Sequence, residues 1–189
     1  MNNYIALLRG INVGGHRVKM DVLRAHVSAL GHSDVWTFIA SGNVGFSTDR
    51  DDPEALARAI EGRLARELGY EVATFLRTPD ELAAVVGIAP DLPDGWDPRT
   101  ASHYVLFLDA PAPASLLSKL AQLESDTDRF LAEFREIHWL TRGRMSESPL
   151  FAGGIGKATN GVRTTTRNMT SLKKLLAKSA SHGSSSRSS

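Results

Sequence analysis

YIALLRGINVGG, at residues 4–15, is an apolar run followed by a glycine-rich turn. The apolar run from Tyr4 to Arg9 predicts a strand that is covered on both faces. After the turn, apolar residues recur at three- and four-residue spacing, at Met20, Leu23, Val27 and Leu30. This spacing predicts an amphipathic helix, so a strand, a glycine turn and a helix open the chain.

The next elements have clear boundary signals. Two short strands are expected at residues 35–40 and 44–47, on either side of Ser41-Gly42-Asn43, where the Gly-Asn pair suits a tight hairpin turn. A helix should follow, with Asp52-Pro53 as its N-cap and first helical residue. Gly69 is a natural helix terminator.

The element order predicts a split βαβ unit. A strand at residues 70–77 and a short helix starting at the capping box Thr78–Glu81 complete the order β-α-β-β-α-β plus one helix. Residues 88–99 contain three prolines and a glycine, which predicts a linker. A strand at residues 103–109, an apolar helical stripe and a strand pair ending at Thr141 then repeat the pattern.

We therefore predict an α+β fold of two tandem ferredoxin-like (split βαβ) subdomains with a C-terminal helix between Thr170 and Lys178. Four glycines disfavour a helix over residues 151–162 and predict a mobile loop there. The expected boundaries are residues 1–87 for subdomain 1, 88–99 for the Pro-rich linker, 100–178 for subdomain 2, and 179–189 for a disordered Ser-rich tail.

Composition restricts the classes of function. With 42% hydrophobic and 23% charged residues, the 189-residue chain has the composition of a globular protein. No apolar run approaches the roughly 20 residues of a membrane-spanning helix, and no secretory signal is visible, so we expect a cytoplasmic protein without a membrane partner. The lack of cysteine excludes thiolate chemistry. The six histidines lack compact ligand spacing, so neither a metal site nor a cofactor is predicted.

Charge is distributed unevenly along the chain. Residues 1–140 hold 13 basic and 20 acidic residues, net −7, whereas residues 141–189 hold 9 and 1, net +8. The basic C-terminal quarter is typical of a face for phosphate or nucleic acid, and equally of a segment that pairs with the acidic remainder.

The turn from Arg9 to Gly15 is a candidate anion site. Glycines let the backbone approach a ligand, and a helix N-terminus favours negative charge. The turn lacks both the dinucleotide fingerprint and the Gly-Lys-Ser/Thr ending of a P-loop. A tight turn without function is the alternative, but several donors surround the glycines: Arg9, Asn12, His16, Arg17 and Lys19.

A second polar segment, Thr164-Thr165-Thr166-Arg167-Asn168, precedes the final helix. It groups hydroxyls, a guanidinium and an amide, which predicts either another anion site or a helix cap with a structural arginine.

The motifs Arg9–Gly15, Ser41–Val44 and Thr165–Asn168, in this order, resemble those of the bacterial family catalogued as domain of unknown function 1697. The resemblance extends from Tyr4 to about Lys178. It implies two ferredoxin-like subdomains, and it implies no activity, because the family has no established function.

The leading hypothesis is a module that binds a phosphate-bearing partner, either a small molecule such as a nucleotide or a nucleic-acid backbone, in one cleft formed by the 10–15 loop and the 165–168 segment.

The alternatives are an enzyme acting on a phosphorylated or carboxylated substrate through His16 or Ser146, and a purely structural role for the motifs. No catalytic residue is assigned, and the oligomeric state stays open. The predicted ligand-binding residues are Arg9, Asn12, Gly14, Gly15, Lys19, Ser41, Asn43, Thr166, Arg167 and Asn168.

Overall fold

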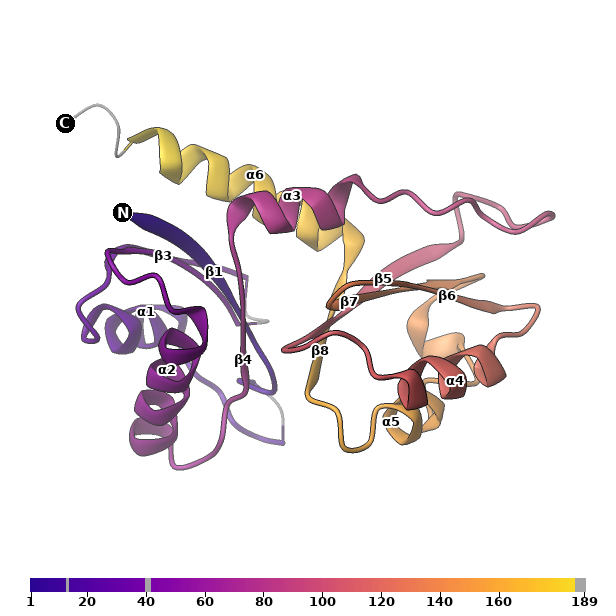
Figure 1. Ribbon diagram of the computed structural model, residues 1–189, viewed down its shortest axis with the longest axis horizontal. Helices are drawn as coiled ribbons and strands as arrows, with labels where there is room; N and C mark the ends of the chain where they lie inside the picture. Colours follow the sequence, from indigo (N-terminus) through magenta and orange to yellow (C-terminus); the bar gives the residue numbers. More distant parts are fainter. Residues whose placement is uncertain (13, 40–41, 186–189) are drawn as a thin grey trace. The chain divides into compact units, whose positions relative to one another are not determined.

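The computed structural model describes residues 1–12, 14–39 and 42–185, and it divides into two compact units. The first unit comprises residues 1–84 with 173–189, and the second comprises residues 85–172. Each unit contains one four-stranded antiparallel sheet with helices (Figure 1). The predicted α+β fold with two ferredoxin-like units is confirmed.

The first unit has the expected element order. Its sheet has the strand order β2-β3-β1-β4, so the two βαβ halves interleave as in a ferredoxin-like fold. The elements up to the boundary with the second unit are β1 (Asn2–Leu8), α1 (Met20–Ser28), β2 (Ser33–Phe38), β3 (Asn43–Thr48), α2 (Pro53–Leu68), β4 (Thr74–Arg77) and α3 (Pro79–Gly87).

Local signals account for the ends of the helices in this unit. The Asp52 carboxylate accepts a hydrogen bond from the Ala55 N–H at 2.9 Å, and Gly69 ends α2 in the left-handed conformation with φ 78°. At the start of α3, the Thr78 N–H donates to the Glu81 carboxylate and the Glu81 N–H donates to the Thr78 hydroxyl oxygen. Both helices therefore begin as the sequence predicts.

The second unit repeats the topology. Its sheet has the order β6-β7-β5-β8, which corresponds strand by strand to the first sheet. The elements are β5 (Ser102–Leu108), α4 (Ala114–Leu123), β6 (Asp128–Glu133), β7 (Glu136–Thr141), the 3-10 turn η1 (Met145–Glu147), α5 (Gly154–Ala158), β8 (Thr164–Asn168) and α6 (Met169–Ser185), whose later part belongs to the first unit.

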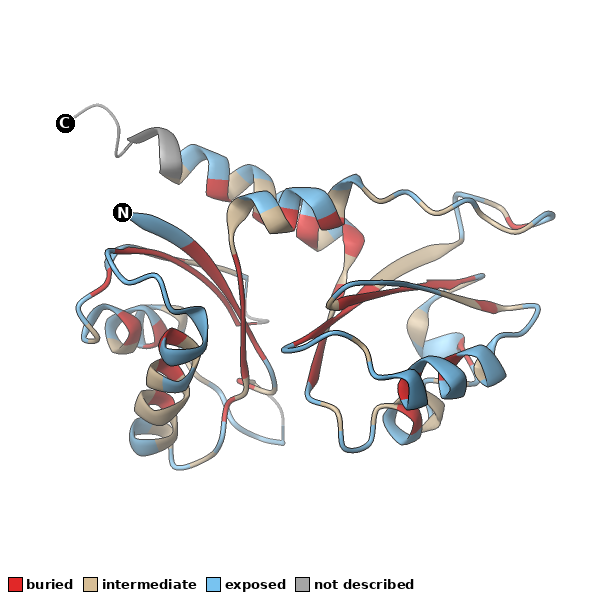
Figure 2. Ribbon diagram, viewed as in Figure 1, coloured by how far each residue is buried: buried red, intermediate tan, exposed pale blue. Residues whose placement is uncertain are grey.

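Each sheet carries its own apolar core. In the first unit, alternate residues of β1 pack with the apolar stripes of α1 and α2. In the second, β5 and β7 pack with α4 and with Ala158 of α5. The buried residues follow the strands and the inward sides of these helices (Figure 2). No helix in the described part of the chain is both long enough and apolar enough to span a bilayer.

Three segments differ from the sequence expectation. Residues 164–168 do precede the final helix, but they form strand β8, paired with β5, and no strand was expected there. The helix that follows runs to Ser185, so the serine-rich residues 179–185 are helical rather than disordered, and residues 173–189 group with the first unit. The glycine-rich stretch 151–162 includes the short helix α5. In all three, tertiary packing outweighs intrinsic propensity.

Candidate functional site

The first predicted motif leaves the end of β1 and is held by backbone hydrogen bonds to two other loops. The Leu8 N–H donates to the Gly42 carbonyl oxygen, and the Arg9 N–H donates to the Ala73 carbonyl oxygen, both at 2.8 Å. The beginning of this motif therefore lies beside the turn that contains the second motif.

Gly42 makes a close contact at this junction. Its φ is +75°, and a Cβ there would lie 2.6 Å from Cγ2 of Ile11. Only glycine fits such a position without a shift of its neighbours. Asn43 is buried and donates from Nδ2 to the Phe38 carbonyl oxygen at 3.1 Å, and Ser41, the third predicted residue here, lies outside the described residues.

Two side chains hold the inner part of the loop between β1 and α1. The Asn12 Oδ1 accepts a hydrogen bond from the Val18 N–H at 2.6 Å, which joins the two ends of the glycine turn. The Tyr70 hydroxyl donates to the Ile11 carbonyl oxygen at 2.8 Å. The His16 ring stacks on the Tyr70 ring, with centroids 4.0 Å apart and planes 26° apart.

We define the basic loop as residues 14–19. Gly14 and Gly15 are exposed, with φ of +64° and +88°, and a Cβ at either residue would meet no atom within 4 Å. His16, Arg17 and Lys19 are also exposed. The basic loop therefore presents open backbone and cationic side chains to solvent, as an anion site requires.

Arg9 and the start of α1 border the basic loop. Arg9 is exposed, directly after β1. Lys19 is the N-cap residue of α1, and its side chain makes no capping hydrogen bond. The helix N-terminus thus has no acidic or hydroxyl cap at the position where one is most often found.

The sequence interpretation missed Tyr70. This residue follows the helix terminator Gly69, and its phenol is partly buried, which raises its pKa and keeps the hydroxyl a donor. An aromatic residue placed directly after a helix C-cap was the available signal. Its two partners, Ile11 and His16, could not be found from spacing.

The third motif belongs to the second unit and lies on strand β8. Arg167 is only 8% exposed, and its Nη1 donates to the Thr165 hydroxyl oxygen and to the Thr166 carbonyl oxygen, both at 2.9 Å. Burial lowers the pKa of this guanidinium to about 10. Thr166 is half-buried, and the Asn168 Oδ1 accepts from the Thr170 N–H at 2.8 Å at the start of α6.

Arg167 has a counterpart in the first unit. Arg77 pairs with Ile5 of β1 as Arg167 pairs with Val105 of β5, and both arginines lie on the last strand of their unit. Arg77 is 1% exposed, and its Nη1 donates to the Leu76 carbonyl oxygen, the carbonyl of its preceding residue, at 2.7 Å. The two arginines therefore make the same contact, from Nη1 to the carbonyl oxygen of the preceding residue, at the same position of the repeated fold.

A histidine pair lies inside the second unit. His103 Nε2 and His138 Nδ1 are 2.8 Å apart, and His138 is fully buried. Burial and the neighbouring His103 lower the pKa of His138 to about 4. Within the described residues, no group of three or more histidine, aspartate or glutamate side chains is arranged to hold a metal ion.

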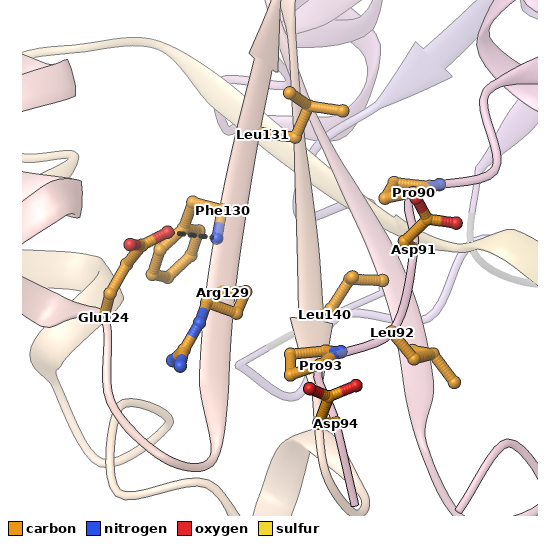
Figure 3. Close-up of a pocket in the computed structure, with 10 residues that line it drawn as sticks. All are labelled: Pro90, Asp91, Leu92, Pro93, Asp94, Glu124, Arg129, Phe130, Leu131 and Leu140. Carbon is orange, nitrogen blue, oxygen red and sulfur yellow. Dashed lines mark hydrogen bonds between the residues drawn. The ribbon is translucent and has the colours of Figure 1, made fainter. Parts of the chain in front are cut away.

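Each unit has a cavity among its described residues. The cavity in the first unit has a volume of about 860 Å³ and lies between the start of β1, Trp36 and α6. The cavity in the second unit, of about 590 Å³, lies between the linker residues 90–94 and the sheet residues Arg129, Leu131 and Leu140 (Figure 3). The described residues that line them include none of the predicted ligand-binding residues.

Comparison with known proteins identifies the family and the fold. A family model described as "Protein of unknown function (DUF1697)" matches residues 1–138. The structure of the conserved bacterial protein SP0830 from Streptococcus pneumoniae is similar, with a TM-score of 0.68 and 22% sequence identity over 94% of this chain and 98% of that chain. At this identity the likeness shows the fold alone. No curated protein sequence matches the chain.

Proposed function

The chain belongs to the DUF1697 family, and we propose that it binds a phosphate-bearing ligand through the basic loop of its first unit. The observation that carries the proposal is the exposure of Arg17 and Lys19 beside two exposed glycines with positive φ. Phosphate oxygens accept strong hydrogen bonds from cationic side chains and from the backbone N–H groups of such turns.

The shape of the loop supports this proposal. Two hydrogen bonds hold the connection between β1 and α1. Asn12 accepts from the Val18 N–H, and the Tyr70 hydroxyl donates to the Ile11 carbonyl oxygen. Arg17 and Lys19 therefore extend from a loop whose backbone is restrained by hydrogen bonds. Such restraint reduces the conformational entropy that is lost when a ligand binds. In this proposal Asn12 and Asn43 shape the site through their hydrogen bonds, while Arg9 adds charge at its border.

That residues 165–168 take part in ligand binding stays a prediction. Arg167 is buried and bonded within its own strand, which favours a structural role for this residue. The proposal is accordingly built on the first unit alone, and a substitution of Arg167 is expected to act on stability before it acts on affinity.

Calorimetric titration with inorganic pyrophosphate and with ribose 5-phosphate tests the proposal. Replacement of Lys19 by Gln removes one exposed cation from the loop, and we expect a loss of affinity of about tenfold, the value of one charge-assisted contact. Lys119→Gln removes an exposed lysine from α4 in the second unit and serves as the matched control, with unchanged affinity expected.

A second arm uses single-stranded oligonucleotides at 50 and 200 mM salt, because contacts to a phosphate backbone weaken steeply as salt rises. Oligonucleotide binding without this salt dependence would exclude backbone recognition. If none of the phosphate compounds binds at low salt, or if Lys19→Gln and Lys119→Gln weaken binding equally, the basic loop is not the site.

A further inference from the structure

We infer that the ligand of the basic loop is a nucleotide, whose base stacks on the face of His16 that Tyr70 does not cover, while its phosphate binds the neighbouring cations. This inference rests on the proposed function and narrows it from phosphate-bearing compounds in general to those that carry an aromatic base.

The inference starts from the ring stack at the loop. His16 lies nearly flat on Tyr70, with centroids 4.0 Å apart and an interplanar angle of 26°. One face of the imidazole is therefore occupied by Tyr70, and the residue as a whole remains exposed. A flat ring that is supported on one face and belongs to an exposed residue is the kind of platform on which proteins stack nucleobases.

The Tyr70 ring, which supports His16, is held in place at both its ends. The Tyr70 hydroxyl donates to the Ile11 carbonyl oxygen at 2.8 Å, and Tyr70 directly follows the left-handed Gly69 that ends α2. The Tyr70 ring is therefore fixed both to the helix and to the loop. A base that stacks on His16 would extend a platform whose orientation is already determined, so little ordering entropy is lost.

Spacing along the chain connects the platform to the phosphate donors. Gly14 and Gly15 directly precede His16, and Arg17 directly follows it. Two residues span at most about 7 Å of extended chain, so the ring and the donors lie within the reach of a single nucleoside monophosphate. The open space around Gly14 and Gly15 leaves room for such a molecule next to the backbone.

The same features discriminate against other phosphate-bearing compounds. A sugar phosphate or a carboxylate satisfies the cations but has no flat π-face to place on the imidazole. A nucleotide uses both the cations and the ring, and base stacking raises affinity by about tenfold or more.

The test measures dissociation constants for adenosine 5′-monophosphate and for ribose 5-phosphate by calorimetry at low salt. The intact protein should bind adenosine 5′-monophosphate about tenfold more tightly than ribose 5-phosphate. His16→Ala should abolish this preference, and His16→Phe, which keeps an aromatic ring, should restore it. His26→Ala, on α1 and outside the loop, is the control and should leave both constants unchanged.

The outcomes distinguish a failure of the nucleotide inference from a failure of the proposed phosphate binding. Equal binding of the two compounds by the intact protein, or an unchanged preference in His16→Ala, overturns the nucleotide inference and leaves phosphate binding by the loop intact. Failure of both compounds to bind overturns the nucleotide inference, and failure of inorganic pyrophosphate and of the oligonucleotides as well overturns the proposed function.

Discussion

Gly45 on β3 is in direct contact with the indole ring of Trp36 on the neighbouring strand β2. A Cβ at residue 45 would overlap three atoms of that ring. Trp36 and Gly45 are cross-strand partners, so the ring lies over the backbone of β3. The absence of a side chain at residue 45 is therefore what lets the indole of Trp36 approach the backbone of β3 so closely.

Replacement of Gly45 by Ala should lower the free energy of unfolding by roughly 2 kcal/mol, because the new methyl group displaces the Trp36 ring. Gly62→Ala is the matched control, since its Cβ would lie 3.9 Å from the nearest atom and Gly62 lies inside α2. That variant should be more stable by roughly 0.5–1 kcal/mol. Urea denaturation measures both, and changes of the same sign would contradict the packing argument.

His138 makes the protein sensitive to acid. Its folded pKa of about 4 is below the ordinary value of 6.5, because burial and His103 disfavour the charged ring. The unfolded chain therefore takes up a proton first as the pH falls. The contribution of His138 to the free energy of unfolding is fully present above pH 6.5. It is lost as the pH falls toward 4, and the total loss is roughly 3 kcal/mol. Burial of His32 acts in the same direction.

The prediction is checked by unfolding free energies at pH 7 and pH 4.5. His138→Gln should lose less stability over this interval than the unsubstituted protein, because one buried neutral imidazole is gone. The nuclear magnetic resonance signals of the His138 ring should also show no titration midpoint of their own between pH 7 and pH 5. A ring that titrates near pH 6.5 would refute the assignment.

At the scale of elements, α6 is positioned by its contacts with β2 in the first unit. The His182 ring stacks on the Trp36 ring at 5.0 Å with an interplanar angle of 5°, and Lys178 Nζ lies 5.9 Å from the centroid of the same ring. Ser179 is buried. These contacts explain why a serine-rich segment is helical, since most helical stability in proteins comes from packing.

Trp36→Leu should therefore loosen the later part of α6. We expect amide hydrogen exchange at residues 176–182 to accelerate about tenfold, the effect of removing one stacking and cation–π partner. Exchange in α4 should not change. Phe134→Leu alters a largely exposed aromatic residue of the second unit and should leave α6 as it is. Equal exchange of α6 in both variants would show that Trp36 does not hold the helix.

At the scale of the whole molecule, the fold redistributes the charge asymmetry of the sequence. Residues 1–84 hold 9 basic and 11 acidic residues, and the segment 173–189, with four basic residues, joins the same unit. The first unit then has 13 basic and 11 acidic residues, and the second has 9 and 10. The basic C-terminal quarter is thus divided between two nearly neutral units, which favours charge matching over a single basic face.

The sequence by itself determined the features that depend on near neighbours. The caps of α2 and α3 and the periodicity of β1 and α1 were predicted correctly, because these signals act over three or four residues. The repeated order of elements was enough to predict two ferredoxin-like units. The glycine loop was located for the same reason, although its ligand stays a proposal.

Only the tertiary structure decided the contacts between distant residues. The Tyr70 hydroxyl reaches Ile11 across 59 residues, and His103 meets His138 across 35. Strand β8 exists because β5 offers an edge to pair with, and the serine-rich end of α6 is helical because Trp36 packs against it. Such contacts depend on strand register and packing, and neither is encoded in the local pattern of any one segment.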